Sequence, residues 1–282
     1  MNYYYLMAGA PELRLSDVQT ALTLEDFRAQ LDEQLSGRDK ALLDEWCFLE
    51  QDYRNVAALL EDAGAELPFA GCLNRSELEG LIACARDEDY KAQGRVQKQL
   101  VDFVRQYDAH HQDEGFFAHD VALYRFLSHA ARHCPNRMMR RWFTLNLNVN
   151  NVLTALLAKR HGWDAARYVM GEGEVQDTIR AHAAEPDLGL SFELEYMHQL
   201  SRIVQEDDPV EKERMIDALR WTWLEDTTFF TTFGIENVFS YLVRLGIKAR
   251  WAGLDVEQGR KRFEEIIDNL RGEARVPQEF VR

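Results

Sequence analysis

The sequence contains few residues that interrupt helices or crosslink the chain. In 282 residues it has six prolines and 16 glycines. Its four cysteines form no Cys-x-x-Cys pair, and the nearest two, Cys72 and Cys84, are 12 positions apart. This spacing excludes a compact disulfide framework and a cysteine-based zinc site, so we expect free thiols.

Basic charge and long apolar runs are also scarce. Lysine and arginine number 33 against 48 acidic residues, which gives a formal net charge of −15. This balance argues against coating of nucleic acid or of anionic lipid, because both require an excess of positive charge, and it leaves room for a small basic patch. No apolar run approaches the roughly 20 residues that cross a bilayer, and the N-terminal stretch lacks the basic segment of a secretion signal. We therefore expect a cytoplasmic protein that does not insert into the membrane directly.

Motifs of catalysis and nucleotide binding are missing as well. The sequence has neither a Gly-x-Ser-x-Gly elbow nor a glycine-rich phosphate loop. The best metal candidate, Glu195-x-x-His198, is half of a carboxylate-bridged di-iron site, and no second Glu-x-x-His accompanies it. The run from Asp108 to Glu114 gathers acidic and histidine side chains, but its polar character is typical of a solvated loop. We expect no catalytic, metal or cofactor site, and hence no enzyme.

Apolar residues recur instead at steps of three and four, the period of an amphipathic helix. The clearest stripe runs through 39–63 and is followed by Gly64, a residue typical of helix ends. Helix starts of the capping-box type are predicted at Thr23-x-x-Asp26 and Ser76-x-x-Glu79. Further helices are predicted at 92–109, 118–133, 138–160, 164–171, 190–205, 210–226, 235–252 and 256–271. The predicted fold class is therefore all-α, although the run 227–233 (TTFFTTF) has a strand-like composition.

An asparagine–valine pair recurs in similar apolar frames. It occurs at Asn55, Asn151 and Asn237, which are 96 and 86 positions apart, each within a predicted helix. We therefore expect a single helical domain made of three related units. The approximate units are 1–110, 111–190 and 191–282. Ordinary helix-turn-helix punctuation would explain the same spacing without a repeat.

Several clusters combine residue types that protein interfaces favour. One gathers guanidinium groups beside tryptophan, at Arg137, Arg140, Arg141 and Trp142. It fits an interaction surface, and the alternative is a helix start with a mixed face. The run Tyr3-Tyr4-Tyr5 should pack against the body of the protein or against a partner, because exposed aromatic side chains lower solubility. A further aromatic concentration, which we interpret as core, comprises Trp221, Trp223, Phe229, Phe230 and Phe233.

Three stretches share a pattern with a known family. They are Asn2-Tyr3-Tyr4-Tyr5-Leu6-Met7-Ala8-Gly9, Leu49-x-x-Asp52-Tyr53-x-Asn55-Val56, and Asn151-Val152 running to Lys159-Arg160-x-Gly162. In these stretches the sequence resembles the C-type subunit of V/A-type rotary ATPases, which is known as the d-type subunit in the eukaryotic enzymes. The whole chain more closely resembles an uncharacterised bacterial family found beside V-type ATPase subunits in bacteria without an obvious C-type subunit.

The resemblance implies three related helical units that form a funnel, and a non-catalytic role. The C-type subunit lies between the membrane rotor ring and the central stalk and transmits torque by packing, without touching nucleotide. By this resemblance the partners are V-type ATPase stalk and rotor-ring subunits, and the protein is held at the inner membrane through them. Two other classes stay open. They are a helical enzyme with a metal or carboxylate site, and a free-standing helical scaffold.

Overall fold

The computed structural model describes residues 3–16, 21–67, 71–112, 118–231 and 233–253. Every regular element in these ranges is a helix, and no strand occurs in them, as the all-α prediction requires. The α-helices are α1 (Tyr4–Gly9), α2 (Leu24–Gln34), α3 (Gly37–Leu43), α4 (Leu49–Glu61), α5 (Arg75–Ala85), α6 (Gly94–His110), α7 (Ala118–His133), α8 (Arg137–Arg160), α9 (Glu174–Ala181), α10 (Met197–Gln205), α11 (Pro209–Thr228) and α12 (Ile235–Gly253). A π-helical turn, η1 (Asp44–Phe48), joins α3 to α4, and a 3-10 helix, η2 (Ala165–Tyr168), follows α8.

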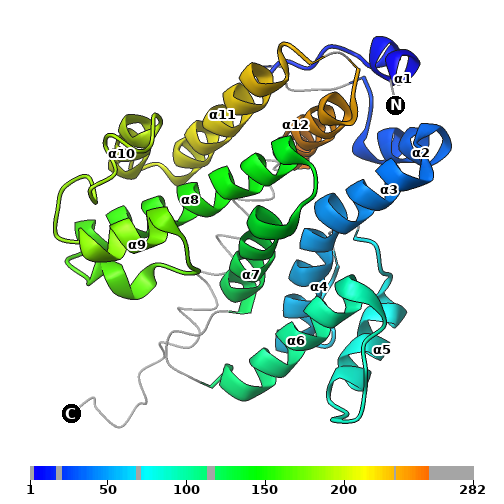
Figure 1. The fold of residues 1–282 in the computed structure, drawn as a ribbon, viewed down its shortest axis with the longest axis horizontal. Coiled ribbons are helices and arrows are strands. Elements are labelled where there is room, and N and C mark those ends of the chain that lie inside the picture. Colours follow the sequence, from blue (N-terminus) through cyan, green and yellow to red (C-terminus); the bar gives the residue numbers. More distant parts are fainter. Residues whose placement is uncertain (1–2, 17–20, 68–70, 113–117, 232, 254–282) are drawn as a thin grey trace, which may run out of the picture.

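Helix α7 lies at the centre of the arrangement, between α4 on one side and α8 on the other (Figure 1). Helix α4 also packs on α5 and α6, which form one arm of the molecule. Helix α8 packs on η2, α9, α10 and α12, and α11 lies against α10 and α12 in the other arm. The core therefore extends from α4 through α7 to α8 without interruption, and the large buried side chains Trp46, Phe126 and Phe143 lie along it.

Helix starts follow the capping chemistry of the sequence. The Thr23 hydroxyl accepts a hydrogen bond from the Asp26 amide at 3.0 Å, which confirms the predicted start of α2. The predicted start at Ser76 is wrong by two residues, because Asn74 and Glu77 form the capping box of α5. The Asn74 side chain accepts from the Glu77 amide at 3.1 Å, and the Glu77 carboxylate accepts from the Asn74 amide at 2.8 Å.

The apolar stripe predicted over 39–63 forms a nearly continuous helical segment from Gly37 to Glu61. Trp46, Leu49, Tyr53 and Val56 are buried along it, as the spacing requires. The segment ends before Gly64, because Asp62 adopts an extended conformation and its carboxylate accepts from the amide of Gly64 at 2.8 Å. An aspartate side chain at the helix end thus replaces the expected glycine stop.

The remaining predicted helices match the structure where the apolar pattern is long. Helix α7 has the predicted bounds, and α8, α11 and α12 differ from theirs by one or two residues. The pattern at 164–171 forms only η2, and the pattern at 190–205 becomes helical only from Met197. In the run 227–233, α11 ends at Thr228 and a turn follows at Phe229 and Phe230. The helix predicted at 256–271 lies outside the described residues.

The N-terminal segment 3–14 runs along α12 and the turn before it. The amide of Tyr3 donates to the Phe233 carbonyl at 2.6 Å. Further along, the Tyr241 hydroxyl donates to the Pro11 carbonyl at 3.0 Å, and the buried Lys248 ammonium donates to the Arg14 carbonyl at 2.7 Å. Segments more than 200 residues apart in the chain are therefore joined at three places.

None of the described helices combines the length and the apolar character that a bilayer crossing requires.

Candidate interaction surface

Asp52, in the frame that carries the family resemblance, fastens a distant segment to α4. Its side chain is completely buried. One carboxylate oxygen accepts from the Leu73 amide at 3.2 Å and the other from the Cys72 amide at 3.1 Å. Burial raises the pKa of Asp52 to about 6, and the two amide donors oppose this rise. Asn55 lies one turn further along α4 and is also buried, so this frame is part of the core.

Asn151 plays a comparable part on α8, where it is completely buried. Its amide nitrogen donates to the Met170 carbonyl at 3.0 Å, and its oxygen accepts from the Met170 amide at 2.8 Å. The side chain thus pairs with the backbone of Met170 on both sides and holds the segment before α9 against α8. Three residues earlier, the buried Asn148 accepts from Gln176 of α9 at 3.1 Å.

The third repeat position, Asn237, lies in the first turn of α12 and is half-buried. Its side chain donates to the Thr231 carbonyl and accepts from the Gly234 amide, both at 3.3 Å. It therefore closes a helix-start turn, whereas Asn55 and Asn151 lie inside their helices. The equivalence of the three positions stays a prediction, and Asn237 differs most from the other two.

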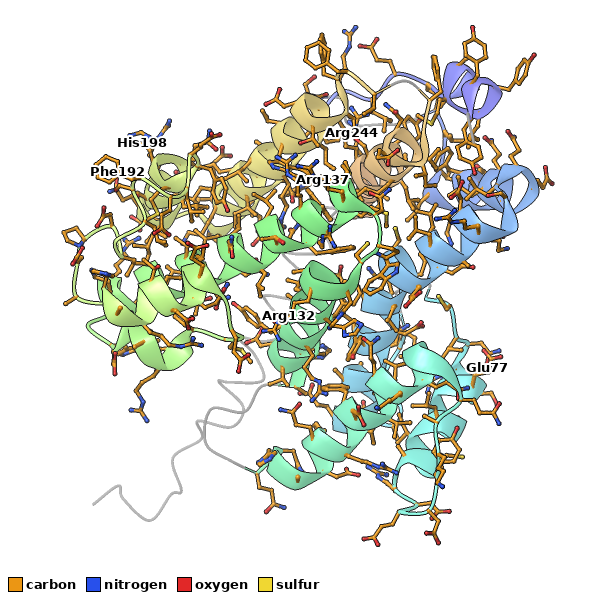
Figure 2. The ribbon with its side chains drawn as sticks, in the orientation of Figure 1. Glu77, Arg132, Arg137, Phe192, His198 and Arg244 are labelled. Carbon is orange, nitrogen blue, oxygen red and sulfur yellow. The ribbon has the colours of Figure 1, made fainter. Side chains whose placement is uncertain are left out.

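The arginine cluster predicted to be an interaction surface divides into an exposed and a buried part. Arg137, Arg140 and Arg141 are exposed on the first turns of α8, and Figure 2 shows Arg137 at the end of α8 beside α12. Trp142 is only 8% exposed, and its ring lies 5.7 Å from that of Trp223 on α11. Trp142 is therefore an anchor within the chain, and only the three arginines are available to a partner.

The three N-terminal tyrosines have different environments. Tyr3 is buried, and its hydroxyl donates to the carboxylate of Asp39 at the start of α3. Tyr4 is 53% exposed and Tyr5 is 88% exposed. The expectation that the run packs against the body of the protein is thus confirmed for Tyr3, whereas Tyr4 is only partly covered, by the ring of Phe233, and Tyr5 is exposed.

The aromatic concentration interpreted as core is also divided. Trp221 is buried, but Phe229 and Phe230 are 76% and 90% exposed in the turn after α11. Their rings meet edge to face at 4.9 Å. The core interpretation is wrong for these two residues, because the helix ends before them and leaves both side chains in the turn. The sequence signal is the position of two phenylalanines within a threonine-rich break between helical patterns.

These exposed aromatic and arginine side chains lie on elements that contact one another. The Tyr4 ring contacts that of Phe233 at 4.8 Å, which links α1 to the α11–α12 turn. The side chain of Asn136, just before α8, donates to the carboxylate of Glu236 in the first turn of α12 at 2.8 Å. The starts of α8 and α12 are therefore joined (Figure 1). We call this surface the docking end; it comprises Tyr4, Tyr5, Phe229, Phe230, Arg137, Arg140 and Arg141.

The candidate metal-binding side chains of the sequence do not form a common site in the described residues. Glu195 is exposed in the turn before α10, and His198 is exposed on the outer side of α10 (Figure 2). Asp108 pairs with Arg86 at 2.9 Å, and Glu114 lies outside the described residues. No group of three histidine, cysteine or acidic residues within the described ranges is arranged to hold a metal ion. All four cysteines are free thiols, as expected.

In its described residues the chain is an all-helical protein that exposes aromatic side chains on α1 and in the turn after α11, and arginine side chains at the start of α8. A family model described as "Protein of unknown function (DUF2764)" matches residues 1–274, and the chain belongs to this family. No curated protein and no solved structure matches the chain. None of these comparisons links the chain to a rotary ATPase.

Proposed function

We propose that this protein is a non-catalytic component of a V/A-type rotary ATPase that connects the central stalk to the membrane rotor ring. In this proposal three related helical units form a funnel like that of the C-type subunit, and the protein is held at the membrane through its partners. The observation that carries the proposal is the docking end, where four exposed aromatic and three exposed arginine side chains lie on elements that the Tyr4–Phe233 and Asn136–Glu236 contacts join.

The composition of the docking end supports a protein partner. Tyrosine, phenylalanine and arginine are enriched in interface cores, and a few such residues contribute most of the binding energy. Exposed aromatic surface is costly in water, so burial against a partner recovers hydrophobic free energy. Three arginines at the start of α8 favour a partner surface rich in carboxylates.

The resemblance to the C-type subunit supports the choice of partner. Two of the motif positions, Asp52 and Asn151, each fasten a downstream backbone segment to a central helix. The resemblance at these positions therefore supports a shared fold, and the docking end supports an interaction with a partner protein.

Co-purification with the rotary ATPase of the same cell tests the proposal. The full-length tagged chain should bring down stalk or rotor-ring subunits. Replacing Phe229 and Phe230 together by serine should lower this association by at least about tenfold, because hot-spot aromatics contribute roughly 2 kcal/mol or more each. Replacing Arg140 and Arg141 by alanine should also weaken it.

Phe192→Ser is the matched control, because Phe192 is fully exposed in the turn before α10, away from the docking end (Figure 2). It should leave association unchanged, and all variants should melt within about 2 °C of the native protein. An unmodified chain that associates with no rotary-ATPase subunit contradicts the function. Association that survives the Phe229/Phe230 double change contradicts the docking end as the contact surface.

A further inference from the structure

A second surface feature is a cleft that shares none of the residues of the docking end. It lies between α6 and α7, over α4, and the backbone turn at Met170 and Gly171 lines one end. Its volume is about 840 Å³, within the range of clefts that bind small molecules. Figure 2 shows Arg132, one of its lining residues, on α7.

The charge of the cleft is opposite to that of the whole chain. Three of its lining residues are permanent cations: Lys98 on α6, and Arg125 and Arg132 on α7. Asp102 is the one carboxylate among the described residues that line it. In a chain of net charge −15, a cleft with this excess of positive charge is a local reversal.

The cations of the cleft are weakly neutralised by the protein itself. The Arg125 guanidinium donates to the amide oxygen of Gln106, a neutral acceptor. Arg132 reaches the carboxylate of Glu172 at 3.4 Å, where both side chains are at least half exposed. Three cations that line a concave surface beside one carboxylate attract anions.

The floor of the cleft is polar and ordered before any ligand enters. The buried Tyr53 hydroxyl donates to the side-chain oxygen of Gln99 at 3.5 Å. The Gln99 amide nitrogen lies 3.0 Å from a ring nitrogen of His129. Trp46 stacks against His129 with ring centroids 5.5 Å apart, and the ring of His133 also contacts His129. These contacts fix the orientation of the groups that a ligand would meet.

The spacing of the cations defines the ligand. Arg125 and Arg132 are seven residues apart on α7, which places them on the same face and about 10 Å apart along the helix. Two arginines at this distance can each bind one oxyanion group. We propose that the cleft binds a small organic molecule with two or more anionic groups, phosphate or carboxylate. The Gln99–His129 and Arg125–Gln106 contacts place Lys98 at the Arg132 end of the cleft, so Lys98 and Arg132 contact one group and Arg125 contacts the other.

Isothermal titration calorimetry of the full-length chain tests this site, with inorganic tripolyphosphate and citrate as probes. At least one probe should bind with a micromolar dissociation constant. Lys98→Gln and Arg132→Gln should each weaken binding by about tenfold, as expected for losing one charge-assisted hydrogen bond. Tighter binding of tripolyphosphate identifies a phosphate ligand, and tighter binding of citrate identifies a carboxylate ligand.

Arg38→Gln is the control, because it removes the same charge from an exposed position on α3, outside the cleft. It should leave binding unchanged. The proposal is overturned if neither probe binds, or if Arg38→Gln weakens binding as much as the cleft variants do. Lys98 is exposed on α6, so Lys98→Gln should have the melting temperature of the native protein. Its effect on binding is then independent of folding. Neither cleft variant should change association through the docking end.

Discussion

At the scale of single residues, the interior of this protein depends on polar side chains that bind backbone groups. A carboxylate or amide placed among apolar helices is costly unless its hydrogen bonds are satisfied. Asp52 and Asn151 satisfy theirs with the backbone of segments about 20 residues downstream. Each side chain therefore fixes the position of the backbone segment that follows its helix, in addition to packing in the core.

The raised pKa of Asp52 predicts a pH-dependent stability. The pKa rises from 3.8 to about 6 on folding, so the folded state favours the protonated carboxyl. The stabilisation that comes from protonating Asp52 in the folded state is fully present below pH 3.8 and is lost as the pH rises through about 6. It amounts to roughly 3 kcal/mol. Urea unfolding of the native protein and of Asp52→Asn at pH 4 to 7 measures it.

Asp52→Asn keeps the shape of the side chain and removes its titration. Its amide group can serve only one of the two backbone donors, so the variant should be less stable than the native protein at pH 4. The difference between the two should shrink as the pH rises to 7. A difference that stays constant over this range would contradict the raised pKa.

The N-terminal tyrosines provide a comparison of buried and exposed aromatic residues. Tyr3→Ala should lower the free energy of unfolding by about 3 kcal/mol, because it removes a large buried side chain. Tyr5→Ala should change it by less than about 0.5 kcal/mol, because Tyr5 is exposed. Chemical denaturation of both variants measures these values. Equal effects of the two changes would show that the exposed ring is also part of the core.

At the scale of elements, the segment 71–73 binds α4 so closely that only glycine fits at position 71. A Cβ atom on Gly71 would lie 1.9 Å from a carboxylate oxygen of Asp52. Gly71→Ala should therefore lower the free energy of unfolding by about 2–3 kcal/mol. Gly80→Ala, in the exposed part of α5 with no atom within 4 Å of the new Cβ, should raise it by about 0.5–1 kcal/mol. Thermal and urea unfolding of the two variants measures these changes. A free energy of unfolding that shifts in the same direction in both variants would contradict the close fit at Gly71.

The elements also show what the sequence can predict. Helices α7, α8, α11 and α12 have long apolar stripes, and their predicted bounds are correct to within one or two residues. Helix α9 has eight residues, too few for a period to stand out, and no pattern predicts it. The predicted start of α5 is misplaced because Ser76 and Asn74 both begin sequences that fit a capping box.

Tertiary contacts limit the prediction of the interaction surface. Trp142 and Phe229 are both large aromatic residues near helix ends, and only the packing of α8 on its neighbours buries one and exposes the other. The cleft between α6 and α7 has no sequence signal, because its cations come from separate helices with no local motif. The arginines at the start of α8 are visible in the sequence, but the contact that joins the start of α8 to the start of α12 is not.

At the scale of the whole molecule, the contact between segment 3–14 and α12 closes the two ends of the described chain on each other. The amide of Tyr3 is hydrogen-bonded and should exchange slowly with solvent, although it is near the N-terminus. Tyr241→Phe removes the hydrogen bond to Pro11 and keeps the ring contact with Phe27. Exchange at Tyr3 should then be about fivefold faster, as expected for about 1 kcal/mol.

Native-state hydrogen exchange followed by nuclear magnetic resonance measures this effect. Exchange in α7, which packs chiefly on α4 and α8, provides the internal control and should stay unchanged in Tyr241→Phe. Exchange of the Tyr3 amide at the rate of an unstructured peptide in the native protein would contradict the closure.

Helix α8 also has a mechanical consequence. It runs for 24 residues, about 36 Å, without a glycine or proline, and neighbouring helices support it along its length. A helix supported in this way behaves as a stiff beam, because bending it would open packed contacts on several sides at once. A force applied at the start of α8 should therefore reach α9 and α10, which pack on it, with little bending of the helix between them.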